Sequence, residues 1–276
     1  MREEYLSRVP EWYRSFEKFD VVLSDDLDGI VSTSALKFAK NWNVEYFYDF
    51  SKLYVTGKTY FKENKNATRV WADVAITRRE MTFDNHISRK NLGDKLNDLC
   101  INPNVITNVT NENYYDKYCG SSALLIWSLY NIPLPETELG KMLLLCIDST
   151  FKGFFGYNNF KERNRFYLCD VLGFEELYEV EKRHSREEFY ELISKYNLNA
   201  KTTIDKDGYL HTDLDLDFIG KELGIELSIP TDKCFIEWRE LEEHKVNNFY
   251  GDVASIKRLI TLAYTGKNFV KYSTMA

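Results

Sequence analysis

Residues 19–32 join an apolar run, three carboxylates and a glycine to a segment with the apolar spacing of a helix. This order predicts a strand that ends in an acidic turn and is followed at once by a helix. Asp26 and Asp28 are two positions apart, so an extended backbone through both would place their carboxylates on the same side. Like charges held this close repel each other, which favours a divalent cation between them; a solvated acidic turn is the alternative.

The composition predicts a globular protein with a substantial core. The chain has 276 residues, of which 44% are hydrophobic and 15% aromatic. Its net charge of −7 argues against binding long nucleic acid by phosphate neutralisation, although it permits a small phosphorylated substrate. We expect a cytoplasmic protein with reduced thiols, because the sequence has no membrane-length apolar run, no signal-peptide core and no zinc-type or redox-type cysteine spacing.

The segments after residue 29 alternate between helical and strand-like patterns. Helical spacing over 30–42 precedes a strand-like segment at 44–50, and another apolar strand follows at 69–75. This alternation predicts an α/β fold, with a mainly parallel sheet and flanking helices. Ligands of such sheets lie at the carboxyl ends of the strands, where we expect Asp26 and Asp28.

Further polar side chains follow other apolar segments, and we expect all of them at strand ends along one edge of the sheet. They are Asp73, Asp84, Asn85, His86 and Asp148. Oxygen ligands with one imidazole suit Mn²⁺ or Mg²⁺ better than zinc. A carboxylate could bridge two such ions, which would share a hydroxide and clamp a phosphorus centre. The pattern therefore predicts phosphoester hydrolysis.

Several side chains could hold the substrate. Ser121 and Ser122 begin a predicted buried helix over 120–130, where N–H groups and hydroxyls suit a phosphate oxygen or, alternatively, ordinary capping. Lys152 lies in an aromatic and basic segment that fits a loop over a site, or a packed loop without a chemical role. Arg78 and Arg89 are the other predicted substrate contacts.

A change in pattern near residues 197–200 predicts a boundary between a metal-binding domain, 1–196, and a small α+β C-terminal module, 201–276. In the module we expect two short strands around Asp207-Gly208, a helix over 216–223 ended by Gly224, a strand to Ile229 and a final helix over 253–264.

The ordered acidic motifs resemble those of the DHH phosphoesterase superfamily. This superfamily includes RecJ-type single-strand exonucleases, oligoribonucleases, cyclic-dinucleotide phosphodiesterases and family II inorganic pyrophosphatases. Residues 24–32 resemble its first motif and Asp73 its second, while Asp84-Asn85-His86 resembles the third and Asp148 the fourth. The resemblance covers roughly the first two thirds of the chain.

The resemblance implies a site with two metal ions, with Asp26 at one ion, Asp28 and Asp148 at the other, and Asp73 between them. His86 would face the substrate or, after a small register shift, reach the metal. Asp73 and His86 are therefore the catalytic candidates, and Asp84, Asn85 and His86 complete the set of metal candidates. The chain departs from the family at Ser24 and Asn85, where active members carry metal ligands. The family's glycine-rich histidine motif is also missing from residues 201–276.

Three functions follow from these patterns. The first is a metal-dependent phosphodiesterase, a nuclease-like hydrolase of short single-stranded oligonucleotides or small cyclic nucleotides. The second, suggested by Ser24 and Asn85, is a DHH-fold protein that binds a nucleotide or a protein partner without turnover. The third is a haloacid-dehalogenase-like phosphatase with Asp26 as nucleophile, for which Gly251-Asp252 would be the later acidic pair.

Overall fold

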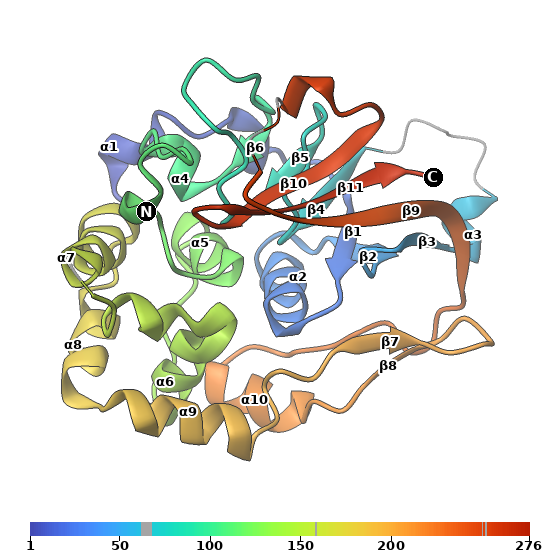
Figure 1. Ribbon diagram of the computed structural model, residues 1–276. Helices are drawn as coiled ribbons and strands as arrows, with labels where there is room; N and C mark the ends of the chain where they lie inside the picture. Colours follow the sequence, from blue (N-terminus) through green and yellow to red (C-terminus); the bar gives the residue numbers. More distant parts are fainter. Residues whose placement is uncertain (62–67, 158, 250, 252) are drawn as a thin grey trace.

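Figure 1 shows the computed structural model, which describes residues 1–61, 68–157, 159–249, 251 and 253–276. The strands are β1 (Asp20–Ser24), β2 (Asn43–Tyr48), β3 (Lys52–Thr56), β4 (Arg69–Ala72), β5 (Met81–Phe83), β6 (Cys100–Ile101), β7 (Thr202–Ile204), β8 (Leu210–Thr212), β9 (Phe235–Asn247), β10 (Leu259–Gly266) and β11 (Phe269–Met275). The α-helices are α1 (Glu3–Leu6), α2 (Leu27–Lys40), α3 (Gly57–Tyr60), α4 (Pro103–Ile106), α5 (Ser122–Leu129), α6 (Glu138–Cys146), α7 (Phe160–Arg165), α8 (Glu175–Arg183), α9 (Arg186–Lys195) and α10 (Leu216–Leu223). Short 3₁₀-helices cover Glu11–Arg14, Tyr114–Asp116, Ile147–Gly153 and Val253–Ser255, and a π-helix covers Phe166–Leu172.

The prediction of an α/β fold is confirmed, but the main sheet is mixed and not mainly parallel. Its strand order is β10-β11-β9-β3-β2-β1-β4-β5-β6, and β7 pairs with β8 in a separate two-stranded sheet. The strands from β2 to β6 in this order pair in parallel, whereas β3, β9, β10 and β11 pair antiparallel. The error has two causes: β2 and β3 form a local antiparallel hairpin, and β9 pairs with β3 from a distant part of the sequence.

The C-terminal strands curl over one end of the parallel half. The first part of β9 pairs with β3 and its last part pairs with β11. Strand β10 then reaches the segments that follow β4 and β5, through bridges from Thr261 to Ile76 and from Tyr264 to Ile87. Residues 201–276 therefore contribute to the same sheet as residues 1–196, and they lie above the carboxyl ends of its parallel strands (Figure 1).

The two faces of the sheet are covered in different ways. Val21 and Leu23 of β1 face a core formed with α2 and α5, which lie together on one side of the sheet (Figure 1). Val22 faces the opposite side, in a second core with Trp71 of β4 and Ile260 of β10. Because β1 is buried on both faces, its sequence is a continuous apolar run without the polar alternation of a surface strand.

The acidic turn after β1 differs from the extended geometry that the sequence suggested. Asp26 is the N-cap of α2, and its carboxylate accepts a hydrogen bond from the Gly29 N–H at 3.1 Å. The chain is helical from Leu27, so Asp28 lies in the first turn of the helix and not on the strand. The expectation that Asp26 and Asp28 share one side of an extended strand is therefore wrong.

The apolar run before Asp148 is a helix, α6, and not a strand. Thr137 caps it by accepting a hydrogen bond from the Gly140 N–H at 2.9 Å. A mostly apolar run of this length does not distinguish a buried strand from a buried helix, which explains the error. Asp148 therefore reaches the site from a helix end.

In the C-terminal part, the hairpin of β7 and β8 and the helix α10 are confirmed, with Gly224 ending α10 in a left-handed conformation. The expected strand up to Ile229 is absent from the described residues of that segment. The expected helix over 253–264 is wrong, because most of it forms β10, which pairs along its length with β11. In the part of the chain that the structure describes, no helix has the length and apolar character needed to cross a membrane.

Candidate functional site

Strands β1 and β4 lie side by side at the centre of the parallel half, although β2 and β3 separate them in the sequence. The chain leaves β1 toward one side of the sheet and returns to its other side for β4. In open parallel sheets a reversal of this kind opens a crevice at the carboxyl ends of the strands. Asp26 follows β1 and Asp73 follows β4, so both border this crevice.

Asp73 is held in a left-handed backbone conformation, with φ of 61°, which few residues other than glycine adopt. Its N–H donates to the Phe83 carbonyl at 2.9 Å, and its Oδ1 accepts from the Ser122 hydroxyl at 2.9 Å. Burial and the charges of Asp28 and Asp26 raise its pKa well above the usual range of a carboxyl group. A strained backbone and a raised pKa together are typical of a functional carboxylate.

Asp28 was predicted to bind metal, but the structure places it against the start of α5. Its two carboxylate oxygens accept hydrogen bonds from the N–H groups of Ser122 and Ala123, each at 2.8 Å. Ser32 donates a third hydrogen bond at 3.2 Å. Burial, followed by the charges of Asp148 and Asp26, raises the pKa of Asp28 to about 7. Asp28 therefore anchors the start of α5 through both of its carboxylate oxygens.

Ser121 and Ser122 are fully buried, in a different setting from the phosphate site that the sequence suggested. The Ser121 hydroxyl accepts from the Leu124 N–H at 3.1 Å, as an ordinary N-cap does. The Ser121 N–H donates to the Thr150 hydroxyl at 3.2 Å, and Asp28 takes the Ser122 N–H. Ser122 therefore holds the carboxylates of Asp28 and Asp73, whereas Ser121 caps α5 and ties its start to Thr150.

Asp84 orients His86 and has no free oxygen of its own. Its Oδ1 accepts from the His86 N–H at 3.1 Å and lies 2.8 Å from His86 Nδ1, while its Oδ2 accepts from Asn102 at 2.9 Å. Nδ1 is therefore the donor, and Nε2 is left for a ligand. Burial lowers the pKa of His86, but the hydrogen bond and the charge of Asp84 outweigh it, so the net shift is upward. The His86 side chain remains 32% exposed.

The side-chain oxygen of Asn85 is buried and accepts no hydrogen bond from the described residues. Its Nδ2 donates to Asp148 Oδ2 at 2.7 Å and to the Gly120 carbonyl at 3.0 Å. Both partners are acceptors, which fixes the orientation of the amide and leaves Oδ1 without a hydrogen bond among the described residues. The residue is only 7% exposed. A buried oxygen in this position is favourable only if a cation or a donor satisfies it.

Asp148 completes the cluster, and its backbone is also left-handed, with φ of 48°. Desolvation raises the pKa of its carboxyl group. The charge of His86 opposes this shift, and the charge of Asp26 adds to it. Asp26, Asp73 and Asp148 thus affect one another electrostatically, although they follow a strand, another strand and a helix.

Lys201 is a member of the site that the sequence did not reveal. Its Nζ lies 2.9 Å from Asp25 Oδ1 and 3.2 Å from Asp26 Oδ2. Burial lowers its pKa, but the carboxylates of Asp26 and Asp25 raise it more, so the amine stays charged. The Thr202 N–H donates to the Asp25 carbonyl, which holds this segment against the acidic turn. No local pattern identifies a partner this distant along the chain.

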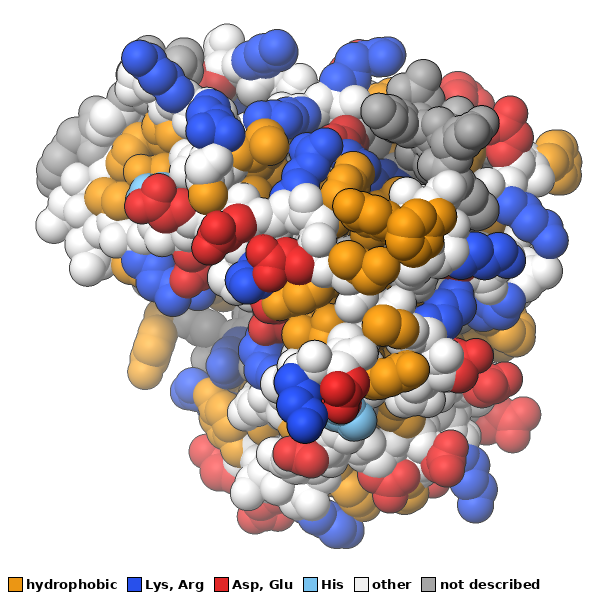
Figure 2. All heavy atoms as spheres, turned by 90° about the vertical axis from the view of Figure 1, so that its right-hand side faces the viewer, with side chains coloured by type: hydrophobic (Ala, Val, Ile, Leu, Met, Phe, Trp, Pro, Cys, Tyr) orange, Lys and Arg blue, Asp and Glu red, His pale blue; other side chains and the backbone are white. Residues whose placement is uncertain are grey.

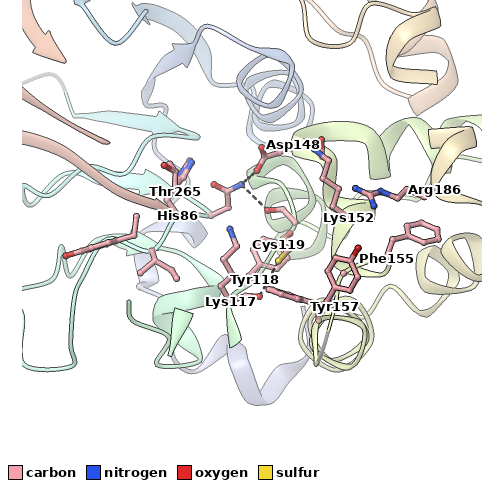
Figure 3. Close-up of a pocket in the computed structure, with 18 residues that line it drawn as sticks. His86, Lys117, Tyr118, Cys119, Asp148, Lys152, Phe155, Tyr157, Arg186 and Thr265 are labelled. Carbon is pink, nitrogen blue, oxygen red and sulfur yellow. Dashed lines mark hydrogen bonds between the residues drawn. The ribbon is translucent and has the colours of Figure 1, made fainter. Parts of the chain in front are cut away.

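Two cavities meet at these residues, and both are lined by His86, Asp148 and Thr265. The acidic cavity, about 410 Å³, is bordered by Asp25, Asp26, Asp73, His86 and Asp148, and by Lys201, Glu243, Lys245 and Lys271. The basic cavity, about 460 Å³ and drawn in Figure 3, is bordered by Asn85, His86, Lys117, Asp148, Lys152, Tyr157 and Arg186 among others. The three shared residues make the cavities two parts of one cleft.

The predicted substrate contacts are distributed unevenly. Lys152 borders the basic cavity. Arg78 borders neither cavity; it is exposed and donates to the Leu259 carbonyl at 3.2 Å. Arg89 is buried and also borders neither cavity. The bordering cations Lys117, Arg186, Lys245 and Lys271 were missed, because only the tertiary fold turns them toward the cleft.

The residue types at the site suit a metal ion better than the positions of their side chains do. Across residues 1–61, 68–157, 159–249, 251 and 253–276, no three His, Cys, Asp or Glu side chains are grouped closely enough to hold a metal ion. The oxygens of Asp26, Asp73 and Asp148, with the orphan oxygen of Asn85, are nevertheless the hard donors that Mn²⁺ and Mg²⁺ prefer. Ser24 is fully buried, and its hydroxyl has no hydrogen-bond partner among the described residues.

Replacement of Asp84 tests how His86 is held. Asp84→Asn removes the negative charge at Nδ1 but leaves the burial of the ring, so the pKa of His86 should fall below its wild-type value. Histidine NMR titration would measure this shift, with His184, which pairs with Glu138 and Glu188, as the internal control. An unchanged titration of His86 would show that Asp84 does not set its charge.

No protein-family model, curated protein or solved structure matches this chain.

Proposed function

We propose that the cleft is the active site of a metal-dependent phosphoesterase that hydrolyses a small nucleotide or a short single-stranded oligonucleotide. The observation that carries the proposal is the convergence of Asp26, Asp73 and Asp148 with His86 at the carboxyl ends of β1 and β4. Asp26, Asp73, Asp148 and the orphan Asn85 oxygen would hold Mn²⁺ or Mg²⁺, as one or two ions. A bound ion would act as a Lewis acid toward the phosphate and lower the pKa of water.

The chain's own side chains would position the phosphate. Asp84 holds the His86 ring and favours its charged form, so Nε2–H can donate to a phosphate oxygen at the junction of the cavities. Lys271 lies opposite Lys245 in the pairing of β11 with β9, and both border the acidic cavity. Lys245 is paired with Glu243 at 2.7 Å, whereas Lys271 forms no ion pair among the described residues and would be the ammonium group available to a phosphate.

The surface supports a small substrate. The chain is acidic overall, and Figure 2 shows acidic and basic side chains interspersed on one side of the molecule, with hydrophobic groups between them. Long nucleic acid is usually bound by a continuous basic surface. The cavities have volumes in the range of about 300–1,000 Å³ that is typical of small-molecule sites.

The proposal is tested with protein stripped of metal by EDTA and then dialysed. We expect bis-p-nitrophenyl phosphate to be hydrolysed after Mn²⁺ is added, and calorimetry to show Mn²⁺ binding in the absence of substrate. Hydrolysis at the same rate without added metal, or a lack of Mn²⁺ binding, would contradict the proposal.

The second candidate is a protein that binds a nucleotide without turnover, and Lys201 favours it. The ammonium group already offsets part of the negative charge of the acidic turn, and the oxygens of Asp28 and Asp84 are engaged by hydrogen bonds. A cation would then be unnecessary for stability. Tight nucleotide binding in EDTA, with the nucleotide recovered intact after incubation with Mn²⁺, would support this function over the first.

Lys201→Gln separates the two candidates. If a metal ion and the Lys201 ammonium compete for the carboxylates of Asp25 and Asp26, removal of the ammonium should tighten Mn²⁺ binding by about three- to tenfold. Calorimetry would measure the change, and Lys206→Gln, at the exposed turn between β7 and β8, is the matched control. Equal affinity in the three proteins would mean that no metal binds at the acidic turn.

A further inference from the structure

The basic cavity contains three cations that lack a carboxylate partner. Lys117, Lys152 and Arg186 border it, and none of them forms an ion pair within the described part of the chain. Asp148 is the only acidic residue that borders this cavity among the described residues. The acidic cavity beyond the junction has the opposite balance, with more carboxylates than lysines.

Aromatic rings hold these cations in place. Lys117 Nζ lies 5.2 Å from the centre of the Tyr114 ring, and Lys152 Nζ and the Arg186 guanidinium lie 5.7 and 5.3 Å from that of Tyr190. The hydroxyl of Tyr190 also accepts a hydrogen bond from Arg186 at 3.0 Å. Figure 3 shows Lys117 on one wall and Lys152 and Arg186 on the other. The cavity is therefore preorganised for an anion.

Tyr157 also borders this cavity, and its aromatic ring is exposed. Its side chain is 83% exposed, and no aromatic ring or cation of the described residues packs on it. It borders the cavity on the side of Arg186 (Figure 3). An exposed tyrosine beside cations is a stacking surface for a planar group that carries negative charge.

We infer that the basic cavity binds one nucleoside monophosphate unit, with the base on Tyr157 and the phosphate between Lys117, Lys152 and Arg186. The unit would end at His86, where the two cavities meet, so the ester next to it would reach the acidic cavity. This placement rests on the proposed function, since it assigns the group of the substrate beside the bond that is hydrolysed. The binding itself requires no metal.

Calorimetry of the full chain in EDTA tests the inference with four probes: 5′-AMP, adenosine, ribose 5-phosphate and the dinucleotide pApA. AMP should bind at least about tenfold more tightly than either adenosine or ribose 5-phosphate, because only AMP carries both recognised groups. The dinucleotide should bind at least as tightly as AMP, since the cleft continues past the junction. AMP binding no tighter than that of either fragment would overturn the inference, as would tenfold weaker binding of pApA.

Two variants locate the site. Lys152→Gln combined with Arg186→Gln should weaken the binding of AMP by at least about tenfold. Tyr157→Leu should lower the affinity for AMP to nearly that for ribose 5-phosphate. The matched controls are Lys182→Gln on α8 and Tyr209→Leu at the β7–β8 turn, which border neither cavity and should bind AMP as wild type does. Variants that bind AMP as tightly as the controls would overturn the location.

These results are separable from those for the proposed function. AMP binding in EDTA with no Mn²⁺-dependent hydrolysis of bis-p-nitrophenyl phosphate would leave this inference standing and remove the proposed function. Hydrolysis without AMP binding would do the reverse.

Discussion

Asp73→Asn should reduce the Mn²⁺-dependent hydrolysis of bis-p-nitrophenyl phosphate by about 10³-fold or more. Asp73 is the carboxylate whose charge is opposed by burial and by Asp28, Asp26 and Asp148, so it gains most from a cation. Asparagine has nearly the same shape and tolerates the left-handed backbone, so the fold should persist. Initial rates over a range of Mn²⁺ concentrations would measure the loss.

The stability of the same variant supplies an independent check. Because the pKa of Asp73 is raised in the folded protein, the folded state binds more protons than the unfolded state, and metal-free stability falls as pH rises through the ordinary range of a carboxyl group. Asp73→Asn lacks this group and should therefore lose less stability than wild type between pH 4 and 7, by urea unfolding in EDTA. Asp213→Asn, at an exposed position, is the matched control. Wild-type rates in Asp73→Asn would refute the catalytic role.

Gly29→Ala should destabilise the protein by about 2–3 kcal/mol. A Cβ at this position would lie 2.1 Å from Ser24 Oγ and 2.7 Å from the Ser24 carbonyl oxygen, where α2 starts against the end of β1. The clash involves backbone that is buried on all sides, so it cannot be relieved by a side-chain rotation alone. Urea unfolding monitored by tryptophan fluorescence would give the change in the free energy of unfolding.

The control for this prediction is Gly57→Ala at the first residue of α3. A Cβ there would meet only Ile236 Cδ1, at an ordinary contact distance of 3.7 Å. We expect either no change or a stabilisation of up to about 1 kcal/mol, because alanine restricts the unfolded chain more than glycine does. Equal losses in both variants would mean that the contact with Ser24 does not set the position of α2.

Local sequence patterns predicted the elements whose physics is local. The apolar run of β1, the acidic cap of α2 and the buried helix α5 each carry their own signal, and all three are in the structure. The sequence also predicts that Asp26 and Asp73 lie together, because parallel strands end at the same edge of a sheet.

Predictions failed where a pattern has two physical outcomes. The apolar run of α6 is compatible with a buried strand as well as with a buried helix. It is a helix, so Asp148 follows a helix end and not a strand end. Asp28 was expected on the extended strand with Asp26, yet it lies in the first turn of α2 and accepts hydrogen bonds from two N–H groups of α5. The spacing of residues in the sequence cannot predict this contact, because the contact depends on which helix packs against the acidic turn in the folded protein.

The sequence alone determined the α/β class and the acidic turn after the first strand. Only the tertiary structure decided that Lys201 joins Asp25 and Asp26, that β9 to β11 cover the carboxyl ends of the parallel strands, and that Lys117 and Arg186 share a cavity. The physical reason is range. Capping and strand periodicity act over a few residues, whereas charge pairing and cavity formation depend on segments that are distant in the chain until it folds.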